Sequence, residues 1–371
     1  MRIGVPKEIK DHEFRVGLSP AGAHVLAAHG HDVAVQSGAG AAIGFDDTTY
    51  EAAGARIVAS AKEAYAAELV IKVKEPQPVE YEYTREGQIL FCYQHFAPAP
   101  ELLAAMLERK VTCIAYETVT AADGSFPLLM PMSEIAGRLA VQVGAWALQM
   151  ANGGNGVLLS GVAGVPPAKV VIIGGGTVGT NAARIALGFG ADVTLLDRSP
   201  ERLRILEAVY GAHLKTCFSE PQALRALVRE ADLVIGAVLL PGKLSPKLIT
   251  RADVAAMGNG SVLVDVGIDQ GGIAETSHPT THSDPIYVES GVVHYCVANM
   301  PAAVSRTATL ALTHATLPYA LALATQGLRA ALAADAGLRG GLEVHAGCVT
   351  HPDLAADVGR PYVAAEEALR T

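Results

Sequence analysis

Residues 169–184 read Lys-Val-Val-Ile-Ile-Gly-Gly-Gly-Thr-Val-Gly-Thr-Asn-Ala-Ala-Arg, an apolar run followed by a glycine-rich turn and an alanine-rich stretch. The apolar run predicts a β-strand, Gly174, Gly176 and Gly179 have the spacing G-x-G-x-x-G, and the alanine-rich stretch predicts a helix. A second apolar run, residues 191–197, ends in Asp197. This strand–turn–helix–strand pattern with a terminal acid is typical of a dinucleotide-binding fold.

The glycines and the start of the helix have separate physical roles in this interpretation. Gly174 allows a tight turn, Gly176 lets a pyrophosphate approach the backbone, and Gly179 lets the helix pack closely on the strand. The helix begins near Thr177 and Val178, where unpaired N–H groups and the helix dipole favour a phosphate.

The acid of the motif bears on the choice of dinucleotide. Asp197 can accept hydrogen bonds from both hydroxyls of an adenosine ribose and repels a 2′-phosphate, so the motif predicts NAD rather than NADP as the cofactor. Arg198 has the opposite tendency, because an arginine at this position can contact that phosphate.

Composition excludes several classes of protein. Half of the 371 residues are apolar, there are 38 glycines, and the net charge is −9, which argues against a nucleic-acid partner. Residues 139–168 and 307–328 carry no charge, but glycine, proline and polar residues interrupt them, so they predict buried segments rather than membrane spans. The N-terminus has no signal-peptide pattern, and we expect a cytoplasmic protein.

Alternating strand and helix patterns occur on both sides of the glycine motif. They predict an α/β protein with two Rossmann-like, doubly wound parallel-sheet domains and the active-site cleft between them. We expect a discontinuous substrate domain of residues 1–131 plus 306–371, and a nucleotide domain of residues 132–305. The expected strands are residues 2–5, 32–36, 68–74, 88–93 and 111–116 in the first domain, and 170–173, 193–196, 233–237, 262–266 and 293–296 in the second.

Polar residues that follow strands are candidates for chemistry, because open α/β sheets bind ligands at the carboxyl ends of their strands. Lys74, His95, Asp269 and Asn299 follow four of the expected strands. Each has a second interpretation: Lys74 can be a solvated edge lysine, His95 a structural histidine, and Asp269 a turn residue before two glycines. Arg15 can bind a substrate carboxylate with two parallel hydrogen bonds, or it can form a surface ion pair.

Other chemistry has little support in the sequence. The remaining histidines have no paired metal-ligand spacing, so we predict no catalytic metal. A G-x-S-x-G nucleophile turn is also lacking.

Short motifs follow one another in the order seen in alanine dehydrogenases. They are Glu13-Phe-Arg-Val, Lys72-Val-Lys-Glu-Pro, His95, Ala115-Tyr-Glu, Pro131-Met-Ser-Glu-Ile-Ala-Gly-Arg, Gly174 to Gly179, Gly236-Ala-Val, Asp269-Gln-Gly-Gly and Ala298-Asn-Met-Pro. From residue 1 to about residue 347 the chain resembles that family. The resemblance implies reversible, NAD-dependent oxidative deamination of L-alanine to pyruvate and ammonia, by a homo-oligomer that is usually a hexamer.

The resemblance also implies roles for single residues. Arg15 and Lys74 would hold the substrate together with Asn299, His95 would be the acid–base group, and Asp269 the second catalytic residue. His278 stands where the family often has an arginine near the cofactor. The residues implied to line the nucleotide are Ser133, Asp197, Arg202, Ser219, Val238, Leu239, Val266, Gly267, Ile268, Asp269, Val297, Ala298, Asn299 and Met300.

Two further functions fit the glycine motif. The soluble, nucleotide-binding component of a proton-translocating transhydrogenase has a similar fold, but it needs membrane partners and binds NAD without deaminating a substrate. A redox-sensing nucleotide-binding module is the non-enzymatic alternative. Lys74 together with His95 favours the dehydrogenase, because neither alternative needs this pair.

Overall fold

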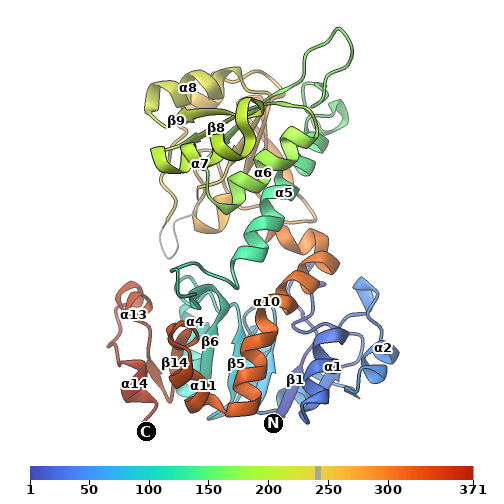
Figure 1. Ribbon diagram of the computed structural model, residues 1–371, viewed down its shortest axis with the longest axis vertical. Coiled ribbons are helices and arrows are strands. Elements are labelled where there is room, and N and C mark those ends of the chain that lie inside the picture. The colour runs from blue at the N-terminus through green and yellow to red at the C-terminus, as the bar shows by residue number, and fades with distance from the viewer. Residues whose placement is uncertain (239–243, 371) are drawn as a thin grey trace. The chain divides into compact units, whose positions relative to one another are not determined.

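The computed structural model describes residues 1–238 and 244–370, and these residues form two compact units. Unit 1 comprises Met1–Met132 and Val304–Thr371, and unit 2 comprises Ser133–Ala303. The chain therefore leaves unit 1 once, builds unit 2, and returns to complete unit 1 with its last residues (Figure 1).

Unit 1 is built on one sheet in the order β15-β14-β6-β5-β4-β1-β2-β3. The strands β1 to β6 are parallel, whereas β14 runs antiparallel to β6 and β15 antiparallel to β14. Their bounds are β1 (Arg2–Val5), β2 (Asp32–Gln36), β3 (Arg56–Val58), β4 (Leu69–Ile71), β5 (Ile89–Cys92), β6 (Thr112–Ala115), β14 (Leu342–His345) and β15 (Cys348–Val349).

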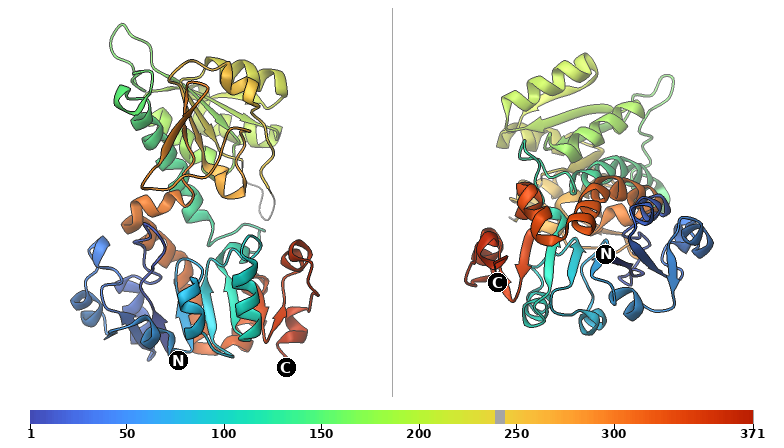
Figure 2. Two further views of the ribbon diagram at one scale, coloured as in Figure 1. Left: turned by 180° about the vertical axis from the view of Figure 1, so that it is seen from behind. Right: turned by 60° about the horizontal axis from the view of Figure 1, so that its bottom comes forward.

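Helices cover both faces of this sheet. Helices α10 and α11 lie against one face, and α4 lies against the other, as the front and back views show (Figures 1 and 2). The helices of unit 1 are α1 (Pro20–Ala28), α2 (Asp47–Ala52), α3 (Ala61–Tyr65), α4 (Pro100–Glu108), α10 (Ser305–Gln326), α11 (Leu328–Ala334), α12 (Ala336–Gly340), α13 (Pro352–Val358) and α14 (Ala365–Ala368).

Unit 2 holds a second sheet in the order β12-β13-β11-β10-β7-β8-β9, parallel except for β12. Its strands are β7 (Lys169–Ile173), β8 (Asp192–Asp197), β9 (Lys215–Phe218), β10 (Leu233–Gly236), β11 (Val262–Asp265), β12 (Ile286–Glu289) and β13 (Val292–Tyr295). Its helices are α6 (Thr177–Gly188), α7 (Pro200–Tyr210), α8 (Pro221–Glu230) and α9 (Arg251–Ala255), and α5 (Met130–Ala147) begins just before the unit boundary.

The predicted fold class is confirmed within each unit. Numbered along the chain, the parallel strands of both sheets have the order 3-2-1-4-5-6, which is the order of doubly wound dinucleotide folds. The central strands β4, β5, β6, β10 and β11 are buried along their whole length, as expected for parallel strands covered by helices on both faces.

The prediction differs from the structure mainly at sheet edges. The strands β3, β9, β12, β14 and β15 were not expected, and each is short or partly exposed, so it lacks a long apolar run. The strand expected over residues 68–74 is also too long, since β4 ends at Ile71. The N–H of Lys72 still donates to the carbonyl of Phe91 in β5, but a side chain accepts the N–H groups of Val73 and Lys74, as described below.

Candidate functional site

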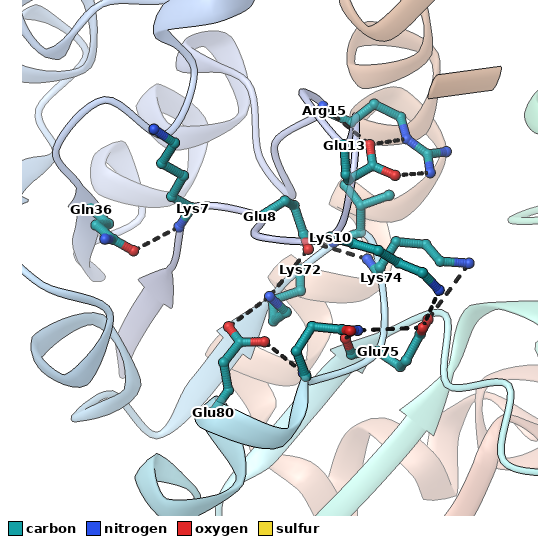
Figure 3. A network of polar contacts seen from close by, with 12 residues as sticks. Lys7, Glu8, Lys10, Glu13, Arg15, Gln36, Lys72, Lys74, Glu75 and Glu80 are labelled. Atoms are coloured by element: carbon teal, nitrogen blue, oxygen red, sulfur yellow. Dashed lines mark hydrogen bonds and ion pairs between the residues drawn. The ribbon is translucent and has the colours of Figure 1, made fainter. Parts of the chain in front are cut away.

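Lys74 lies just after β4 and is nearly buried, with 8% of its surface exposed. Its Nζ is 3.5 Å from Oε2 of Glu75, and Oε1 of Glu75 also binds Nζ of Lys10 at 2.6 Å (Figure 3). Burial alone would raise the pKa of Glu75, but the two lysines outweigh it and lower this pKa to about 2. Lys74 is therefore a buried cation beside an ionised carboxylate. The alternative interpretation of Lys74 as a solvated lysine at the sheet edge is excluded.

Arg15 lies in the segment between β1 and α1 and is 2% exposed. Its Nε and Nη2 donate to the two oxygens of Glu13 at 2.7 and 2.6 Å, and its Nη1 lies 3.2 Å from Sδ of Met132 (Figure 3). The interpretation of Arg15 as a member of a surface ion pair is therefore wrong, because its ion pair with Glu13 is buried. Glu13 accepts hydrogen bonds along the Nε–Nη2 edge of the guanidinium. A substrate carboxylate that makes two parallel hydrogen bonds with Arg15 would therefore bind along the edge formed by Nη1 and Nη2.

His95 follows β5 and has a backbone φ of +48°, which is uncommon for a residue with a side chain. Glu117 in the short turn after β6 holds this conformation: its Oε1 accepts the N–H of His95 at 2.7 Å and that of Gln94 at 3.0 Å. The same oxygen lies 3.6 Å from Nδ1 of the His95 ring, whose side chain is 43% exposed.

The surroundings of His95 keep the ring neutral. Partial burial of the ring, followed by the positive charge of Lys74, lowers the pKa of His95 below its ordinary value. Burial also raises the pKa of Glu117, although the N–H groups of His95 and Gln94 oppose that change. A neutral imidazole that is partly open to solvent can accept a proton, which an acid–base role requires.

In unit 2, the glycine motif has the conformation that its spacing predicts. Gly174 has φ +104°, and a Cβ on Gly179 would lie 1.8 Å from the carbonyl oxygen of Gly174, so the tight turn and the close packing of α6 on β7 are confirmed. Gly176 directly precedes α6, is exposed, and has no atom within 4 Å of the place where a Cβ would lie. A phosphate can therefore reach the backbone at the N-terminus of α6.

Asp197 ends β8 and binds the glycine turn. Its Oδ2 accepts the N–H of Gly175 at 2.6 Å, and its Oδ1 accepts the N–H of Ser199 at 2.7 Å. Arg202 of α7 also binds this turn, since its Nε donates to the carbonyl of Gly175 at 2.5 Å and its Nη2 to Thr180 at 2.7 Å. Asp197 is only half-buried and its neighbour Arg198 is exposed, so both can meet an adenosine ribose.

The other predicted nucleotide residues of unit 2 follow strands of its sheet or lie near the starts of α5 and α6. Ser219 follows β9 and donates its N–H to the carbonyl of Asp197 at 2.9 Å, and Val238 lies against Gly174. Leu239 lies outside the described residues. Ser133 lies in α5, and Thr177 and Val178 begin α6. The segments Val266–Asp269 and Val297–Met300 follow β11 and β13.

Asp269 lies in the turn Val266–Gln270 and is exposed, whereas Gly267 and Ile268 of the same turn are buried. Asp265, the last residue of β11, holds the chain that follows: its Oδ2 accepts the N–H of Ile273 at 2.8 Å and the hydroxyl of Ser277 at 2.6 Å. Its other oxygen is buried and has no hydrogen-bond partner among the residues that the structure describes. Asp265 thus ties the start of the loop that carries Asp269 to its end.

Asn299 has a left-handed backbone, with φ +66°, and lies between buried Val297 and Met300. Its carbonyl lies 3.1 Å from Nε2 of His282. His278 is exposed and stacks on Tyr287 with ring centres 3.8 Å apart. Strained residues such as Asn299 and His95 occur preferentially at functional sites, which agrees with their choice as candidates.

Sequence reasoning missed the acids that hold the candidates. Glu8, Glu13, Glu117 and Asp265 are buried or nearly so and accept backbone N–H groups of the segments that follow strands. Asp265 could have been found, because it ends an apolar run directly. Glu8 follows a lysine in a stretch rich in charge, which is the pattern of a solvated loop, so its sequence context gave no signal.

Two observations on the described part of the chain concern possible binding sites other than the candidates above. A group of three His, Cys, Asp or Glu side chains able to hold a metal ion does not occur there. A hollow of about 650 Å³ in unit 2 is lined by Lys169 and Asp192, the first residues of β7 and β8. It therefore lies at the amino ends of the strands, away from the glycine turn.

Among the helices of residues 1–238 and 244–370, none is both long enough and apolar enough to cross a bilayer. Solved structures resemble the whole chain. A structure described as L-alanine dehydrogenase has a TM-score of 0.94 at 51% identity, covering 97% of this chain and 99% of that one. A transhydrogenase from Sinorhizobium meliloti has a TM-score of 0.83 at 24% identity, over 94% of this chain and all of that one, which is a likeness of fold.

Curated relatives are similar over their full length. An alanine dehydrogenase of Halomonas elongata is 56% identical over 98% of this chain and 99% of its own length. An alanine dehydrogenase 2 of Staphylococcus aureus is 53% identical over the whole of both chains. The models of the N-terminal and C-terminal domains of alanine dehydrogenase/PNT match residues 4–136 and 140–352, respectively. The chain belongs to the alanine dehydrogenase/PNT family.

Proposed function

We propose that the protein is an L-alanine dehydrogenase that uses NAD and interconverts L-alanine with pyruvate and ammonia. The observation that carries this proposal is identity of 53–56% over essentially the full length of proteins named alanine dehydrogenase. The transhydrogenase alternative has the support of fold alone, at 24% identity. In this proposal unit 1 binds the amino acid and unit 2 binds the dinucleotide.

The residues of unit 2 fit a dinucleotide. Exposed Gly176 and the N-terminus of α6 would take the pyrophosphate, and Asp197 the adenosine ribose. The remaining residues in contact with the dinucleotide would be those after β9, β10, β11 and β13, together with Ser133 and Arg202. When bound, the dinucleotide supplies the acceptor for a hydride.

Residues of unit 1, with Asn299 and Asp269 of unit 2, supply the groups that act on the amino acid. Arg15 and Lys74 bind the carboxylate, and Asn299 assists them, which fixes the orientation of Cα. Loss of hydride from Cα and of a proton from nitrogen gives iminopyruvate. His95, neutral at pH 7, accepts a proton from water as that water attacks the imine carbon, and then returns the proton to the leaving nitrogen. As ammonia leaves, the hydroxyl on the same carbon gives up its proton to a base and becomes the carbonyl of pyruvate. Asp269 is the second proton-transferring group.

The proposal extends to the cellular context of the protein. We propose a cytoplasmic homo-oligomer, of which the hexamer is the form suggested by the family resemblance, with small-molecule substrates and without nucleic-acid or membrane partners. Exposed apolar side chains in unit 2, including Met150, Leu158 and Val162, support self-association. Light scattering at micromolar concentration tests this, since a mass near 38.4 kDa would contradict it.

One assay separates the candidate functions. Purified protein is mixed with NAD and L-alanine, and absorbance of NADH is followed, with D-alanine and no amino acid as controls. A dehydrogenase forms NADH only with L-alanine. A transhydrogenase component, which needs membrane partners, and a sensing module bind NAD without forming NADH from L-alanine, and that result would contradict the proposal.

A further inference from the structure

Glu8 lies in unit 1 beside the end of β4 and is 5% exposed. Its Oε1 accepts the N–H of Val73 at 2.6 Å and the N–H of Lys74 at 3.2 Å (Figure 3). Its Oε2 lies 3.2 Å from Nζ of Lys72. Glu8 therefore binds the backbone of Lys74 directly, although 66 residues separate the two.

Lys72 forms the other side of this buried cluster. It is 1% exposed and also donates from Nζ to Oε1 of Glu80 at 2.9 Å, and Glu80 in turn accepts the N–H of Gln77 at 2.8 Å. Burial would lower the pKa of Lys72, but the charges of Glu8 and Glu80 outweigh it and raise this pKa. Burial raises the pKa of Glu8 and the charge of Lys72 opposes that change, while the neighbours of Glu8 named here are all donors, which favours the ionised carboxylate.

The cluster explains why β4 ends early. The N–H groups of Val73 and Lys74 would continue the strand, but they donate to the Glu8 side chain instead. The same arrangement recurs at the two other candidates of unit 1. The N–H of Arg15 donates to Glu13 at 3.2 Å, and the N–H of His95 donates to Glu117 at 2.7 Å. At each candidate, an acidic side chain holds the backbone.

We propose that Glu8 is a positioning residue for the reaction: it places the Lys74 amine by holding the backbone of Val73 and Lys74, with Lys72 as its counter-ion. This inference rests on the proposed function. Glu8 acts through Lys74, because its two oxygens are engaged by the backbone and by Lys72. A shift of the Lys74 backbone moves the amine relative to the substrate carboxylate, and a displacement of ~1 Å at such a group can cost ~100-fold in rate.

The cluster offers a matched control. Glu8→Gln keeps the side-chain shape but puts an amide NH₂ where one oxygen stood, facing donors. Glu80→Gln removes the same charge from the same lysine, yet Glu80 accepts its backbone hydrogen bond from Gln77 and not from Lys74. Both variants lose one ion pair with Lys72 and should lower Tm to a similar extent.

We expect Glu8→Gln to lower kcat/KM for L-alanine at least ~10-fold, mainly through a higher KM for alanine, while the Kd for NAD stays within ~2-fold. Glu80→Gln should stay within ~3-fold in kcat/KM. Lys74→Met provides a second readout: because Glu8 acts through Lys74, adding Glu8→Gln to Lys74→Met should lower kcat/KM by less than ~2-fold more.

Equal losses of kcat/KM in Glu8→Gln and Glu80→Gln would overturn the inference, as would a full ~10-fold further loss in the Lys74→Met background. If Glu8→Gln does not fold, Glu8→Asp replaces it, since the shorter acid keeps the charge and withdraws from Val73 and Lys74. A wild type that forms no NADH from L-alanine would instead overturn the proposed function, and the inference with it.

Discussion

The two units have the same strand order but opposite chemistry where their strands end. In unit 1, acids such as Glu8, Glu13 and Glu117 hold the backbone and side chains of a lysine, an arginine and a histidine. In unit 2, glycines leave the N-terminus of α6 accessible. The proposed function therefore depends on the loops after the strands, and the shared fold only positions them.

The largest effect on stability and NAD binding is expected at Gly179, where the glycine turn leaves no space for a side chain. In Gly179→Ala the new Cβ would meet the carbonyl oxygen of Gly174 at 1.8 Å, so backbone must move. We expect a loss of about 3 kcal/mol or more in stability and no measurable NAD binding. Gly188→Ala in the same helix is the control: a Cβ there meets nothing within 4 Å, and it should stabilise by about 0.5–1 kcal/mol.

Chemical denaturation and NAD titration by calorimetry measure both glycine variants. If Gly179→Ala bound NAD as tightly as the wild type does, the close packing of α6 on β7 would not be needed for NAD binding. That result would contradict the difference proposed between the two units.

The next effect concerns catalysis in unit 1. His95→Ala should reduce kcat for alanine oxidation by about 10²-fold or more, because the water that attacks the imine loses its proton acceptor. NAD affinity should not change, since His95 belongs to unit 1. Exposed His24→Ala on α1 is the control for loss of an imidazole. Steady-state rates that match those of the wild type would remove His95 from the mechanism.

A smaller effect is expected on cofactor choice. Asp197→Asn removes the negative charge at the end of β8 and should reduce the preference for NAD over NADP by about 10-fold in kcat/KM, the value of one hydrogen bond to a charged group. Asp192→Asn, at the amino end of the same strand, should leave the preference unchanged. A wild type that uses both cofactors equally would mean that Arg198 dominates the adenosine contact.

The smallest effect is a change in acid stability. The pKa of Glu75 is lowered to about 2, so the unfolded state binds the proton first, and stability is lost as pH falls from 4.5 towards 2. Glu75→Gln should flatten this part of the curve by on the order of 1 kcal/mol, a modest value because Lys10 is partly exposed. Glu86→Gln, an exposed acid, is the control. Parallel acid-denaturation curves for wild type and Glu75→Gln would contradict the assignment.

Prediction from sequence was strongest where one local signal sufficed. Apolar runs located the buried central strands, and the glycine spacing predicted both the turn at Gly174 and the packing at Gly179. Edge strands such as β9 were missed because half-exposed residues produce no apolar run. Both sheets have the same order of parallel strands. Whether a strand was predicted therefore depended on how clear its own apolar pattern is, and not on the topology of its sheet.

At the candidate site, position in the chain identified Lys74 and His95, because polar residues after apolar strands stand out. The acids that hold them could not be found in this way. Glu8 meets Val73 across 65 residues, and Glu117 meets His95 across 22, so their partners become visible only when strands are paired. Long-range hydrogen bonds to backbone N–H groups leave no periodic trace in a sequence.

We propose that Arg15 and Lys74 of unit 1 bind the carboxylate of the amino acid and that unit 2 binds the dinucleotide. A crystal structure with NADH and pyruvate bound tests it most directly. The account predicts the pyruvate carboxylate on Arg15 and Lys74 and the pyrophosphate at Gly176 and the N-terminus of α6. Pyruvate bound away from Arg15 and Lys74, or a pyrophosphate held by the cations of unit 1, would contradict it.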